Sequence, residues 1–598
     1  MYRTHHCNEL RLADAGKTVT LVGWVNTVRD HHGVIFIDIR DREGVTQCVF
    51  RPEENAEASE SSHSLRAEDV IRVTGRVDQR PEFEGQSTVN ENIETGEIEV
   101  VGTELEVLSK SDVLPFQLDK ELSNEDLRMK HRYLDLRRPR MARNLGTRHA
   151  ITKTIRDVLD KNGFLEVETP ILSKSTPEGA RDFLVPSRLN PGKCYALPQA
   201  PQQYKQLLMV AGVERYFQIA RCFRDEDLRA DRQPEFTQVD IEASFVEAED
   251  IFSLVETVLK RVFKVARGVR VKTPFQRITH QEAMDVYGSD KPERRIGLEI
   301  VDLSEIFAES SFKVFSGAVA KGGVVRAINA KGFASVTTGQ IKRLEEVARE
   351  AGAGGLAYIK AEGGEWKSPI VKFFSDKEKA ALKKKLKVKD GDLVLFGCDK
   401  WRTVCEVLGR LRLEVSDMQN LTEGKEDILD FFWVTDFPLL DYDEEEGKWN
   451  AVHHPFTRPH EDDLELLGDE SRFGEIRAVA YDVVLNGNEL GGGSLRIHES
   501  DLQQKMFTAL GIGEEEQAEN FSHILGAFQF GAPPHGGIAL GLDRLVMLAC
   551  GEDSIREVIA FPKNNRGVDL MSASPAEVDF KQLRELYLKS TVEEKKKG

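Results

Sequence analysis

The sequence has few of the features that mark secreted, membrane-bound or zinc-binding proteins. Its 598 residues include seven cysteines, which are scattered and form no Cys-x-x-Cys pair. This pattern predicts free thiols in a reducing cytoplasm and argues against a zinc site. No run of about eighteen apolar residues occurs, and the opening MYRTHH has no basic segment followed by an apolar one. We therefore expect neither a membrane span nor a signal peptide.

Positive charge is also scarce. The chain carries 82 Lys and Arg against 101 Asp and Glu, a net charge of −19. This excess of acid argues against a protein that coats nucleic acid non-specifically, and it confines any RNA contact to local basic patches. No internal repeat is evident, and 598 residues exceed what one hydrophobic core supports. We expect three or more domains.

The N-terminal hundred residues are rich in β-branched residues separated by turns. Gly23 and Gly75 interrupt two of the apolar segments, as glycine does where a barrel strand bends or approaches another backbone. Five short strands of this kind predict a small barrel, and the oligonucleotide-binding (OB) fold has that size. We expect an excursion at 51–69 and a long polar loop at 78–97. The five predicted strands are 19–25, 34–39, 45–50, 70–77 and 98–101.

Residues 109–135 have mixed charge and little periodicity, which predicts a hinge. After it, Ile151, Ile155, Val158 and Leu159 lie on one face of a helix that Asn162-Gly163 should terminate. Residues 164–172 follow as a strand that contains Pro170. Proline confines such a strand to a sheet edge or a break, an arrangement common where subunits meet.

The run 221–240 alternates apolar and charged residues, and it predicts two strands joined by a dense charged loop. Arginine binds phosphate well because its planar fork meets two oxygens at once and keeps its charge. A solvated hairpin tip with self-compensating charges explains the run equally well. The basic and amide side chains of the run are Arg221, Arg224, Arg229, Arg232 and Gln233.

Two further regions differ in composition from the segments before them. Glycine-rich pieces alternate with a lysine-rich helical run between about 290 and 415, which predicts an inserted α/β module. The lysines of 377–387 fit a solvated helix face better than an RNA site. After 430 the chain returns to strands, then to a helix-like stretch at 500–530. A small-residue strand then runs into a helix that begins with Asp543-Arg544.

The proline-bearing strand, the arginine-rich hairpin and the strand into Asp543-Arg544 occur in the order of the three signature motifs of class II aminoacyl-tRNA synthetases. With the N-terminal barrel, the chain resembles the bacterial-type aspartyl-tRNA synthetases over nearly its whole length. The resemblance implies a multidomain α/β protein with an OB-fold barrel, an antiparallel catalytic sheet flanked by helices, and an inserted α+β domain of the GAD type. The implied boundaries are 1–108 for the anticodon-binding barrel, 109–135 for the hinge, 136–289 and 416–560 for the two parts of the catalytic domain, 290–415 for the insert, and 561–598 for a C-terminal extension.

The resemblance also implies how ATP and Mg²⁺ are held. Arg224 would clamp the α-phosphate and Arg544 the γ-phosphate, while Phe236 would stack on adenine. Asp482 and Glu489 would bind Mg²⁺, a hard ion that prefers oxygen ligands. Taken alone, each carboxylate is better read as a surface charge. The remaining nucleotide contacts implied by the motifs are Asp225, Glu226, Gln233, Gly541, Leu542 and Asp543.

The resemblance also implies a pocket that selects aspartate. Such a pocket needs cations for the side-chain carboxylate of aspartate and an anion for its ammonium group. Lys205 and Arg496 match the first task and Asp240 the second. A charged pocket of this kind should reject asparagine. The other pocket residues are Glu178, on a substrate lid, Gln202 and His453. A metal site at His453-His454 is disfavoured because no third ligand is nearby at helical spacing.

On the barrel, Arg29 and Phe36 match residues that contact an anticodon, with Gln47 beside them. Phe36 alternates with Ile35 and Ile37, which favours an exposed ring, and stacking is how single-stranded RNA is usually read. His31, in the loop after Arg29-Asp30, resembles relaxed enzymes that charge both tRNA-Asp and tRNA-Asn. The second determinant of that choice is Gly85 or a neighbour.

The sequence therefore favours a cytoplasmic, homodimeric ligase that joins aspartate to tRNA-Asp and also tRNA-Asn, with an amidotransferase as a further partner. Four alternatives stay open. They are a strictly tRNA-Asp-specific enzyme, an asparaginyl or a lysyl enzyme on the same barrel, and a catalytically inactive RNA-binding relative. Arg496 and Lys205 favour an anionic substrate side chain and so argue against the asparaginyl and lysyl enzymes. Joint retention of both phosphate arginines and both metal carboxylates argues against the inactive one.

Overall fold

The computed structural model describes residues 2–83, 85–120, 124–175, 180–227 and 231–591. Its contacts divide the chain into two compact units. The first contains residues 1–125 and 133–142, and the second contains 126–132 and 143–598. No helix in the described ranges is both long and apolar enough to cross a bilayer.

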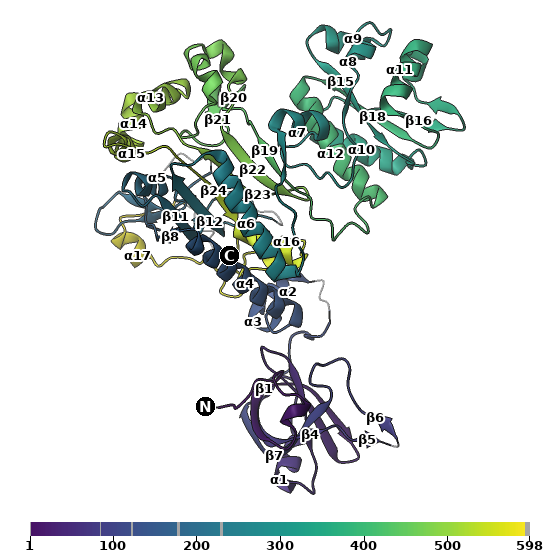
Figure 1. Ribbon diagram of the computed structural model, residues 1–598, viewed down its shortest axis with the longest axis vertical. Coiled ribbons are helices and arrows are strands. Elements are labelled where there is room, and N and C mark those ends of the chain that lie inside the picture. The colour runs from purple at the N-terminus through teal and green to yellow at the C-terminus, as the bar shows by residue number, and fades with distance from the viewer. Residues whose placement is uncertain (1, 84, 121–123, 176–179, 228–230, 592–598) are drawn as a thin grey trace, which may run out of the picture. The chain divides into compact units, whose positions relative to one another are not determined.

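The first unit contains a closed five-stranded barrel with strand order β1-β2-β3-β7-β4 (Figure 1). This confirms the expected OB fold. A Cβ atom on Gly23 would lie 2.3 Å from the carbonyl oxygen of Arg40, and one on Gly75 would lie 2.3 Å from that of Val101. Both glycines therefore permit a close approach of two backbones. The strands are β1 (Thr18–His31), β2 (Val34–Arg40), β3 (Val45–Phe50), β4 (Val70–Gln79) and β7 (Ile98–Ser109).

The loops of the barrel contain more structure than expected. The excursion after β3 forms helix α1 (Ala56–Ser62), whose first turn is capped by Asn55. The predicted loop at 78–97 contains a short hairpin of β5 (Glu82–Phe83) and β6 (Gln86–Ser87). The hinge region likewise contains α2 (Glu125–Lys130) and α3 (Arg132–Asp135). Local polar caps and turns produce these elements without an apolar periodicity.

The second unit is built on an eight-stranded sheet with order β13-β19-β22-β23-β24-β12-β11-β8. The pairs β13·β19 and β11·β8 are parallel, and the central pairs are antiparallel. The expected antiparallel sheet is therefore confirmed, with one parallel pair at each edge. The strands are β8 (Leu165–Glu166), β11 (Arg215–Phe223), β12 (Glu235–Ser244), β13 (Gln276–Thr279), β19 (Phe431–Thr435), β22 (Ala480–Leu485), β23 (Asn488–Leu495) and β24 (His535–Gly541).

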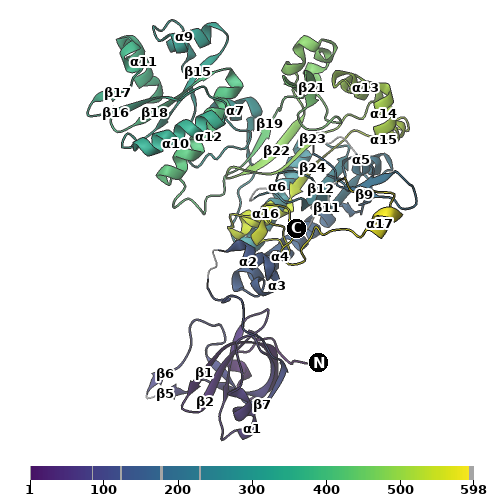
Figure 2. The same ribbon diagram turned by 180° about the vertical axis from the view of Figure 1, so that it is seen from behind.

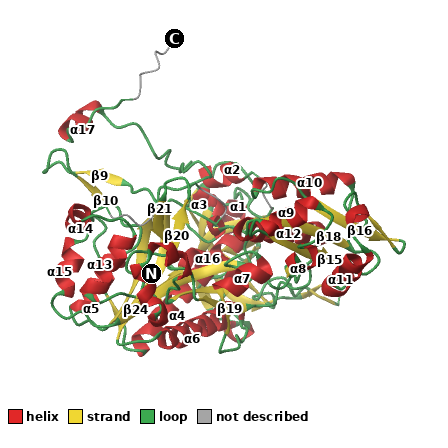
Figure 3. Cartoon of the chain, turned by 90° about the horizontal axis from the view of Figure 1, so that it is seen from above, coloured by secondary structure: helices red, strands yellow, loops and turns green. Residues whose placement is uncertain are grey.

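Helices cover one face of this sheet (Figures 1 and 3). Val239, Ile241 and Ala243 alternate along β12 and pack into a core with α4 (Pro139–Lys161), α6 (Ala248–Arg267) and α16 (Leu542–Cys550). Because side chains alternate along a strand, the residues between them point to the opposite face. That second face contains the site described below.

The proline-bearing segment differs from the prediction. A nine-residue strand was expected at 164–172, but β8 contains two residues, and Pro170 lies outside regular structure. Proline lacks the N–H that would continue the ladder.

The helix-like stretch at 500–530 is three helices, not one. They are α13 (Ser500–Ala509), α14 (Glu514–Asn520) and α15 (Ser522–Phe528). The further elements of this unit are α5 (Gln202–Val210), α7 (His280–Tyr287), α17 (Phe580–Glu585), β9 (Leu184–Pro186), β10 (Cys194–Ala196), β20 (Leu440–Asp443) and β21 (Lys448–Ala451).

The inserted region has its own sheet with order β14-β15-β18-β16-β17, covered by helices on both faces (Figure 2). Helices α10 (Thr338–Glu350) and α12 (Trp401–Gln419) pack on one face. The other face carries α8 (Ser304–Phe307), α9 (Lys313–Ala320) and α11 (Asp376–Leu386). The strands are β14 (Val301–Asp302), β15 (Val324–Ala330), β16 (Ala357–Glu362), β17 (Glu365–Lys367) and β18 (Leu393–Asp399).

One buried arginine ties α12 to the segment that enters the insert. Arg412 is 1% exposed, and its guanidinium donates to the backbone carbonyls of Tyr287 at 3.0 Å, Glu293 at 3.1 Å, Gly297 at 2.8 Å and Leu298 at 2.7 Å. Burial lowers the pKa of Arg412 to about 10, so the group stays charged at neutral pH. The four carbonyls depend on this side chain for their hydrogen bonds.

We expect Arg412→Met to lower the free energy of local opening of α12 by at least about 3 kcal/mol, because buried carbonyls lose their donor. Hydrogen exchange of the α12 amides measures this quantity. Arg410→Met is the matched control, since Arg410 is an exposed residue of the same helix. This variant should change the free energy of local opening of α12 by less than about 0.5 kcal/mol. Equal protection in both variants would contradict the anchoring role.

Candidate active site

The floor of the site is a row of residues that runs across four strands. Asp240 on β12 pairs with Ala539 on β24, Ala539 pairs with Gly492 on β23, and Gly492 pairs with Asp482 on β22. Two carboxylates therefore lie at the same level with two small residues between them. A Cβ atom on Gly492 would come within 2.5 Å of the Asp482 carboxylate. Glycine at this position leaves room for the acidic side chain.

A second row places the main charges of the predicted aspartate pocket. Glu242, two residues along β12 from Asp240, is fully buried. Its carboxylate accepts hydrogen bonds from Arg496 at 2.9 and 3.2 Å and lies 3.2 Å from the ammonium of Lys205. Lys205 on α5 also donates to Asp240 at 2.6 Å. The two predicted cations and the predicted anion are thus brought together.

Glu242 was missed by the sequence analysis, although its spacing from Asp240 could have revealed it. Burial alone would raise the pKa of Glu242, but adjacent Arg496 and Lys205 lower it to about 2. Burial raises the pKa of Asp240, against the opposing effect of Lys205. Its second carboxylate oxygen is buried and has no hydrogen-bond partner among the described residues. This oxygen is an open acceptor.

Three histidines line the end of the site that contains this charge cluster. Burial lowers the pKa of His453 to about 4, and its Nε2 has no partner in the described chain. His454, which was not proposed as a site residue, contacts Arg496 through its Nε2, and burial holds its pKa well below the usual value. Both rings are therefore neutral near pH 7. Gln202 is buried and bonds to Gln206 at 3.3 Å, and Gln206 contacts His535 at 3.2 Å.

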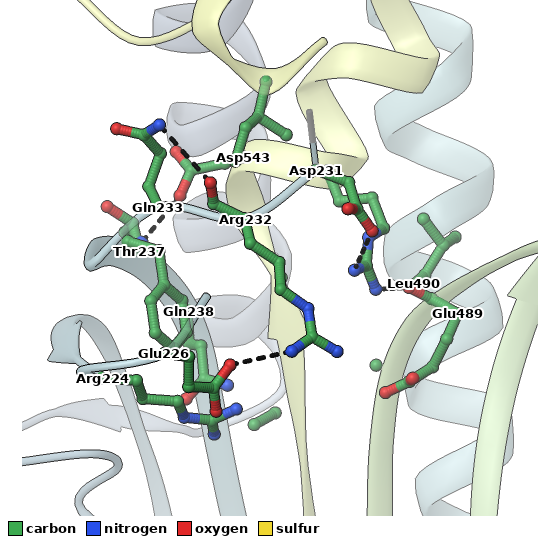
Figure 4. Close-up of a pocket in the computed structure, with 16 residues that line it drawn as sticks. Arg224, Glu226, Asp231, Arg232, Gln233, Thr237, Gln238, Glu489, Leu490 and Asp543 are labelled. Atoms are coloured by element: carbon green, nitrogen blue, oxygen red, sulfur yellow. Dashed lines mark hydrogen bonds and ion pairs between the residues drawn. The ribbon is translucent and has the colours of Figure 1, made fainter. Parts of the chain in front are cut away.

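Figure 4 shows a cavity of about 220 Å³, and Ala539 of the first row, the strand partner of Asp240, is among its lining residues. Arg224 lines it, and the guanidinium of Arg224 lies 5.1 Å from the ring centroid of Phe236. The Arg224 Nε is buried and has no hydrogen-bond partner among the described residues. Arg224, a lining residue of the cavity, therefore has an unpaired donor. Phe236 contributes an aromatic face, already approached by a cation on one side.

Other charged residues of the cavity have partners from the chain itself. Arg544 donates to the backbone carbonyl of Glu489 and to the Asp231 carboxylate at 3.2 Å. Glu226 accepts a hydrogen bond from Arg232 at 2.9 Å. Figure 4 marks the pair of Arg232 and Glu226 with a dashed line. Asp225 is exposed and lies outside the cavity lining; its backbone N–H bonds to the carbonyl of Arg181 at 3.1 Å, and its carboxylate lies 3.7 Å from the Arg181 guanidinium.

Three residues predicted to contact the nucleotide also have partners or packing within the chain. The Gln233 amide donates to the carbonyl of Lys563 at 2.9 Å and accepts from its N–H at 2.8 Å. Asp543 accepts from the Thr237 N–H at 2.8 Å and from Arg148 at 2.6 Å. Leu542 is 1% exposed and packs into the core beneath the sheet. Gln233, Gly541 and Asp543 line the cavity.

Asp482 and Glu489 fit a divalent cation. Burial raises the pKa of Asp482 well above its usual value, and the nearby Glu489 and Asp290 raise it further. A cation between the two carboxylates would relieve this repulsion. Glu489 lines the cavity, so its oxygens are open to a ligand. No group of three metal-ligating side chains occurs among the described residues, and phosphate oxygens would have to complete the coordination.

The barrel residues lie on one face of β1–β3. Phe36 is half-buried and meets the exposed His31 edge-on at a centroid distance of 5.8 Å. His31 is the last residue of β1 and not a loop residue, because the turn is formed by His32 (φ 54°) and Gly33 (φ 88°). Arg29 is paired with Asp38 at 3.0 Å.

The two other barrel residues differ in accessibility. Gln47 is only 5% exposed, which leaves it little surface for a base. Gly85 is exposed in the turn between β5 and β6, with φ 75°. Glu178, the predicted lid residue, lies outside the described residues.

The buried charge cluster, the open arginine beside an aromatic ring and the OB barrel together define a class II aminoacyl-tRNA synthetase. The family model "tRNA synthetases class II (D, K and N)" matches residues 124–565. The model "OB-fold nucleic acid binding domain" matches 19–108. The chain belongs to this family of class II synthetases, among the aspartate–tRNA ligases.

Two curated relatives are similar over nearly their whole length. An aspartate–tRNA(Asp/Asn) ligase of Methylacidiphilum infernorum is 56% identical, covering 98% of this chain and 97% of the relative. An aspartate–tRNA ligase of Geobacillus kaustophilus is 54% identical, covering 98% and 99%. A crystal structure of asparaginyl-tRNA synthetase from Pyrococcus horikoshii complexed with asparaginyl-adenylate shares the fold at a TM-score of 0.58 and 20% identity, covering 94% and 98%.

We expect Glu242→Gln to destabilise the catalytic domain by about 3 kcal/mol at pH 7, because two buried cations lose a counter-charge. Since the pKa of Glu242 is lowered from 4.5 to about 2, its stabilising contribution is present above pH 4.5 and is lost as pH falls toward 2. The difference between variant and wild type, measured by urea unfolding, should therefore shrink in acid.

Glu166→Gln is the matched control for this change. Glu166 pairs with Arg156 at 2.8 Å on the surface, where both side chains are more than a third exposed. Loss of an exposed pair should cost less than about 1 kcal/mol. A Glu242→Gln variant no less stable than the control would contradict the role of Glu242 as the counter-charge.

Proposed function

We propose that this chain activates L-aspartate with ATP to aspartyl-adenylate and transfers the aspartyl group to the 3′ end of tRNA-Asp and of tRNA-Asn. The observation that carries the proposal is the buried cluster of Lys205, Asp240, Glu242 and Arg496, which adjoins a cavity with an unpaired Arg224. The charge cluster suits a small zwitterion with an acidic side chain. The cavity suits a triphosphate.

The charges of the cluster support aspartate over asparagine or lysine. Lys205 and Arg496 are nearly fully buried, and a substrate carboxylate would share their N–H groups. The free oxygen of Asp240 would accept from the substrate ammonium. An amide side chain would leave cationic donors without an anionic acceptor in a dry site, which costs several kcal/mol. A lysine side chain would face two like charges.

The activation step is a displacement at phosphorus. A carboxylate oxygen of aspartate attacks the α-phosphorus of ATP, the bond to the bridging oxygen breaks, and pyrophosphate leaves with both bonding electrons. Negative charge builds on the α-phosphate oxygens, where Arg224 can donate to them, and on the pyrophosphate, which Arg544 can bind. Mg²⁺ held by Asp482 and Glu489 would neutralise phosphate charge.

The transfer step and the choice of tRNA use the rest of the chain. A ribose hydroxyl of the terminal adenosine attacks the aspartyl carbonyl, and AMP leaves. On the barrel, the half-buried Phe36 and the exposed His31 offer rings on which anticodon bases can stack. One relative's name includes tRNA(Asp/Asn) and another's does not. The relaxed form is favoured by His31, and strict tRNA-Asp specificity is the alternative.

Assembly as a cytoplasmic homodimer is part of the proposal. Leu165, Ile171 and Leu172 flank Pro170 and are 57%, 42% and 52% exposed. Apolar side chains gathered on one surface segment favour contact with another protein. If tRNA-Asn receives aspartate, an amidotransferase must convert the product to asparaginyl-tRNA. A catalytically inactive relative is disfavoured, because it would have no need of an unpaired Arg224 beside buried carboxylates.

We expect Arg224→Ala to lower the rate of aspartate-dependent ATP–pyrophosphate exchange by about 10²- to 10³-fold, the cost of losing one donor to transition-state charge. The KM for aspartate should change far less, because Arg224 contributes in the transition state and not in the ground state. A change confined to that KM would contradict its role as the phosphate clamp.

Arg221→Ala is the control for Arg224→Ala. Arg221 lies on β11, three residues before Arg224, but is paired with Glu235 at 2.6 Å and does not line the cavity. Its loss should leave exchange within about threefold of wild type, since a surface pair contributes little. Absence of exchange in the wild-type protein at saturating aspartate and ATP would reject the proposed function itself.

We expect purified tRNA-Asn to be charged with aspartate at a kcat/KM within about 100-fold of that for tRNA-Asp, because one unfavourable base contact costs about 1–3 kcal/mol. His31→Leu should widen that ratio while charging of tRNA-Asp stays the internal control. A wild-type ratio above roughly 1,000-fold would show strict specificity for tRNA-Asp.

A further inference from the structure

We infer that Asp231 occupies the place of the terminal phosphate of ATP when no nucleotide is bound, and so sets selectivity between nucleotides with and without a γ-phosphate. The inference rests on the proposed function. Arg544 is the arginine assigned to the γ-phosphate, and in this structure its guanidinium donates to the Asp231 carboxylate at 3.2 Å. Both residues line the cavity, and Figure 4 shows Asp231 with a dashed line at its carboxylate.

The chemistry of the pair supports an exchange of one anion for another. A guanidinium donates to carboxylate and phosphate oxygens with the same planar geometry. Arg544 is also held by the backbone carbonyl of Glu489, so one nitrogen is fixed by the sheet while the other faces Asp231. An incoming γ-phosphate would meet an arginine already positioned but occupied.

The exposure of the pair is suited to exchange. The side chain of Arg544 is 25% exposed and that of Asp231 is 43% exposed. An ion pair at such a place is worth about 0.2–1 kcal/mol, far less than the buried pairs of Glu242. Asp231 therefore keeps Arg544 ordered without blocking a triphosphate. Release of pyrophosphate would follow the same exchange in reverse, with Asp231 returning to Arg544.

The selectivity follows from competition. ATP must displace Asp231 to reach Arg544, so its apparent affinity falls by the fraction of Arg544 that is paired. ADP has no γ-phosphate, leaves the pair intact and avoids this loss. Removing the Asp231 carboxylate should therefore strengthen binding of ATP and of pyrophosphate and leave ADP unchanged. Simple relief of negative charge near the cavity would instead strengthen all three.

The test measures ATP and ADP affinity by calorimetry without aspartate, in the full-length protein and in Asp231→Asn, Asp231→Glu and Asp227→Asn. Asp227→Asn is the matched control, since Asp227 is exposed on the same loop and its carboxylate has no partner among the described residues. We expect Asp231→Asn to tighten ATP binding about two- to fivefold and to leave ADP unchanged. Asp231→Glu should stay near wild type, and the KM for pyrophosphate in the exchange reaction should fall in Asp231→Asn alone.

Three outcomes would overturn the inference. Equal tightening of ATP by Asp231→Asn and Asp227→Asn would assign the effect to overall charge. Equal tightening of ATP and ADP by Asp231→Asn would do the same. Weaker ATP binding in Asp231→Asn would make Asp231 a ligand of the nucleotide or its cation. In each case the wild-type protein still binds ATP, whereas absence of ATP binding in the wild type would reject the proposed function and not this inference alone.

Discussion

The site depends on a charge balance at the centre of the sheet. Arg496 and Lys205 lie away from water, and Glu242 supplies the counter-charge that permits both. Removing a cation from water costs several kcal/mol unless an anion and good hydrogen bonds replace the solvent. With Glu242 in place, the donors of both cations are fixed in direction before a substrate arrives. That arrangement makes the aspartate end of the site preorganised.

The β-sheet delivers these charges through its two-residue period. On β12 the apolar residues face the helices, and Asp240 and Glu242 face the site. The neighbouring strands leave space for them with small residues, and a Cβ atom on Gly537 would lie 2.2 Å from the Glu242 carboxylate. Core and site are thus two faces of the same strands, and helix packing on one face fixes side-chain positions on the other.

Local sequence patterns predicted much of this architecture. The β-branched segments of the barrel and the strand before Asp543-Arg544 could be found because their signals lie within a few residues. Glu242 was within reach of the same alternation that placed Asp240. The pairing of Gln233 with Lys563 and of Asp231 with Arg544 was not, since each joins residues more than 300 positions apart. The turn at His32 depends on backbone geometry that periodicity does not report.

The two ends of the site handle charge in opposite ways, and the difference matches their ligands. The aspartate end binds a small, rigidly defined group, and its charges are paired in a dry environment whose geometry cannot relax cheaply. The nucleotide end binds a flexible, highly charged chain that must enter and leave in every cycle. Its arginines are either unpaired at one donor, as Arg224 is, or paired with partly exposed carboxylates. Strong fixed pairs confer selection among amino acids, and weak exchangeable pairs allow turnover of the phosphates. A single sheet supports both because depth of burial, and not residue type, decides how firmly each pair is held.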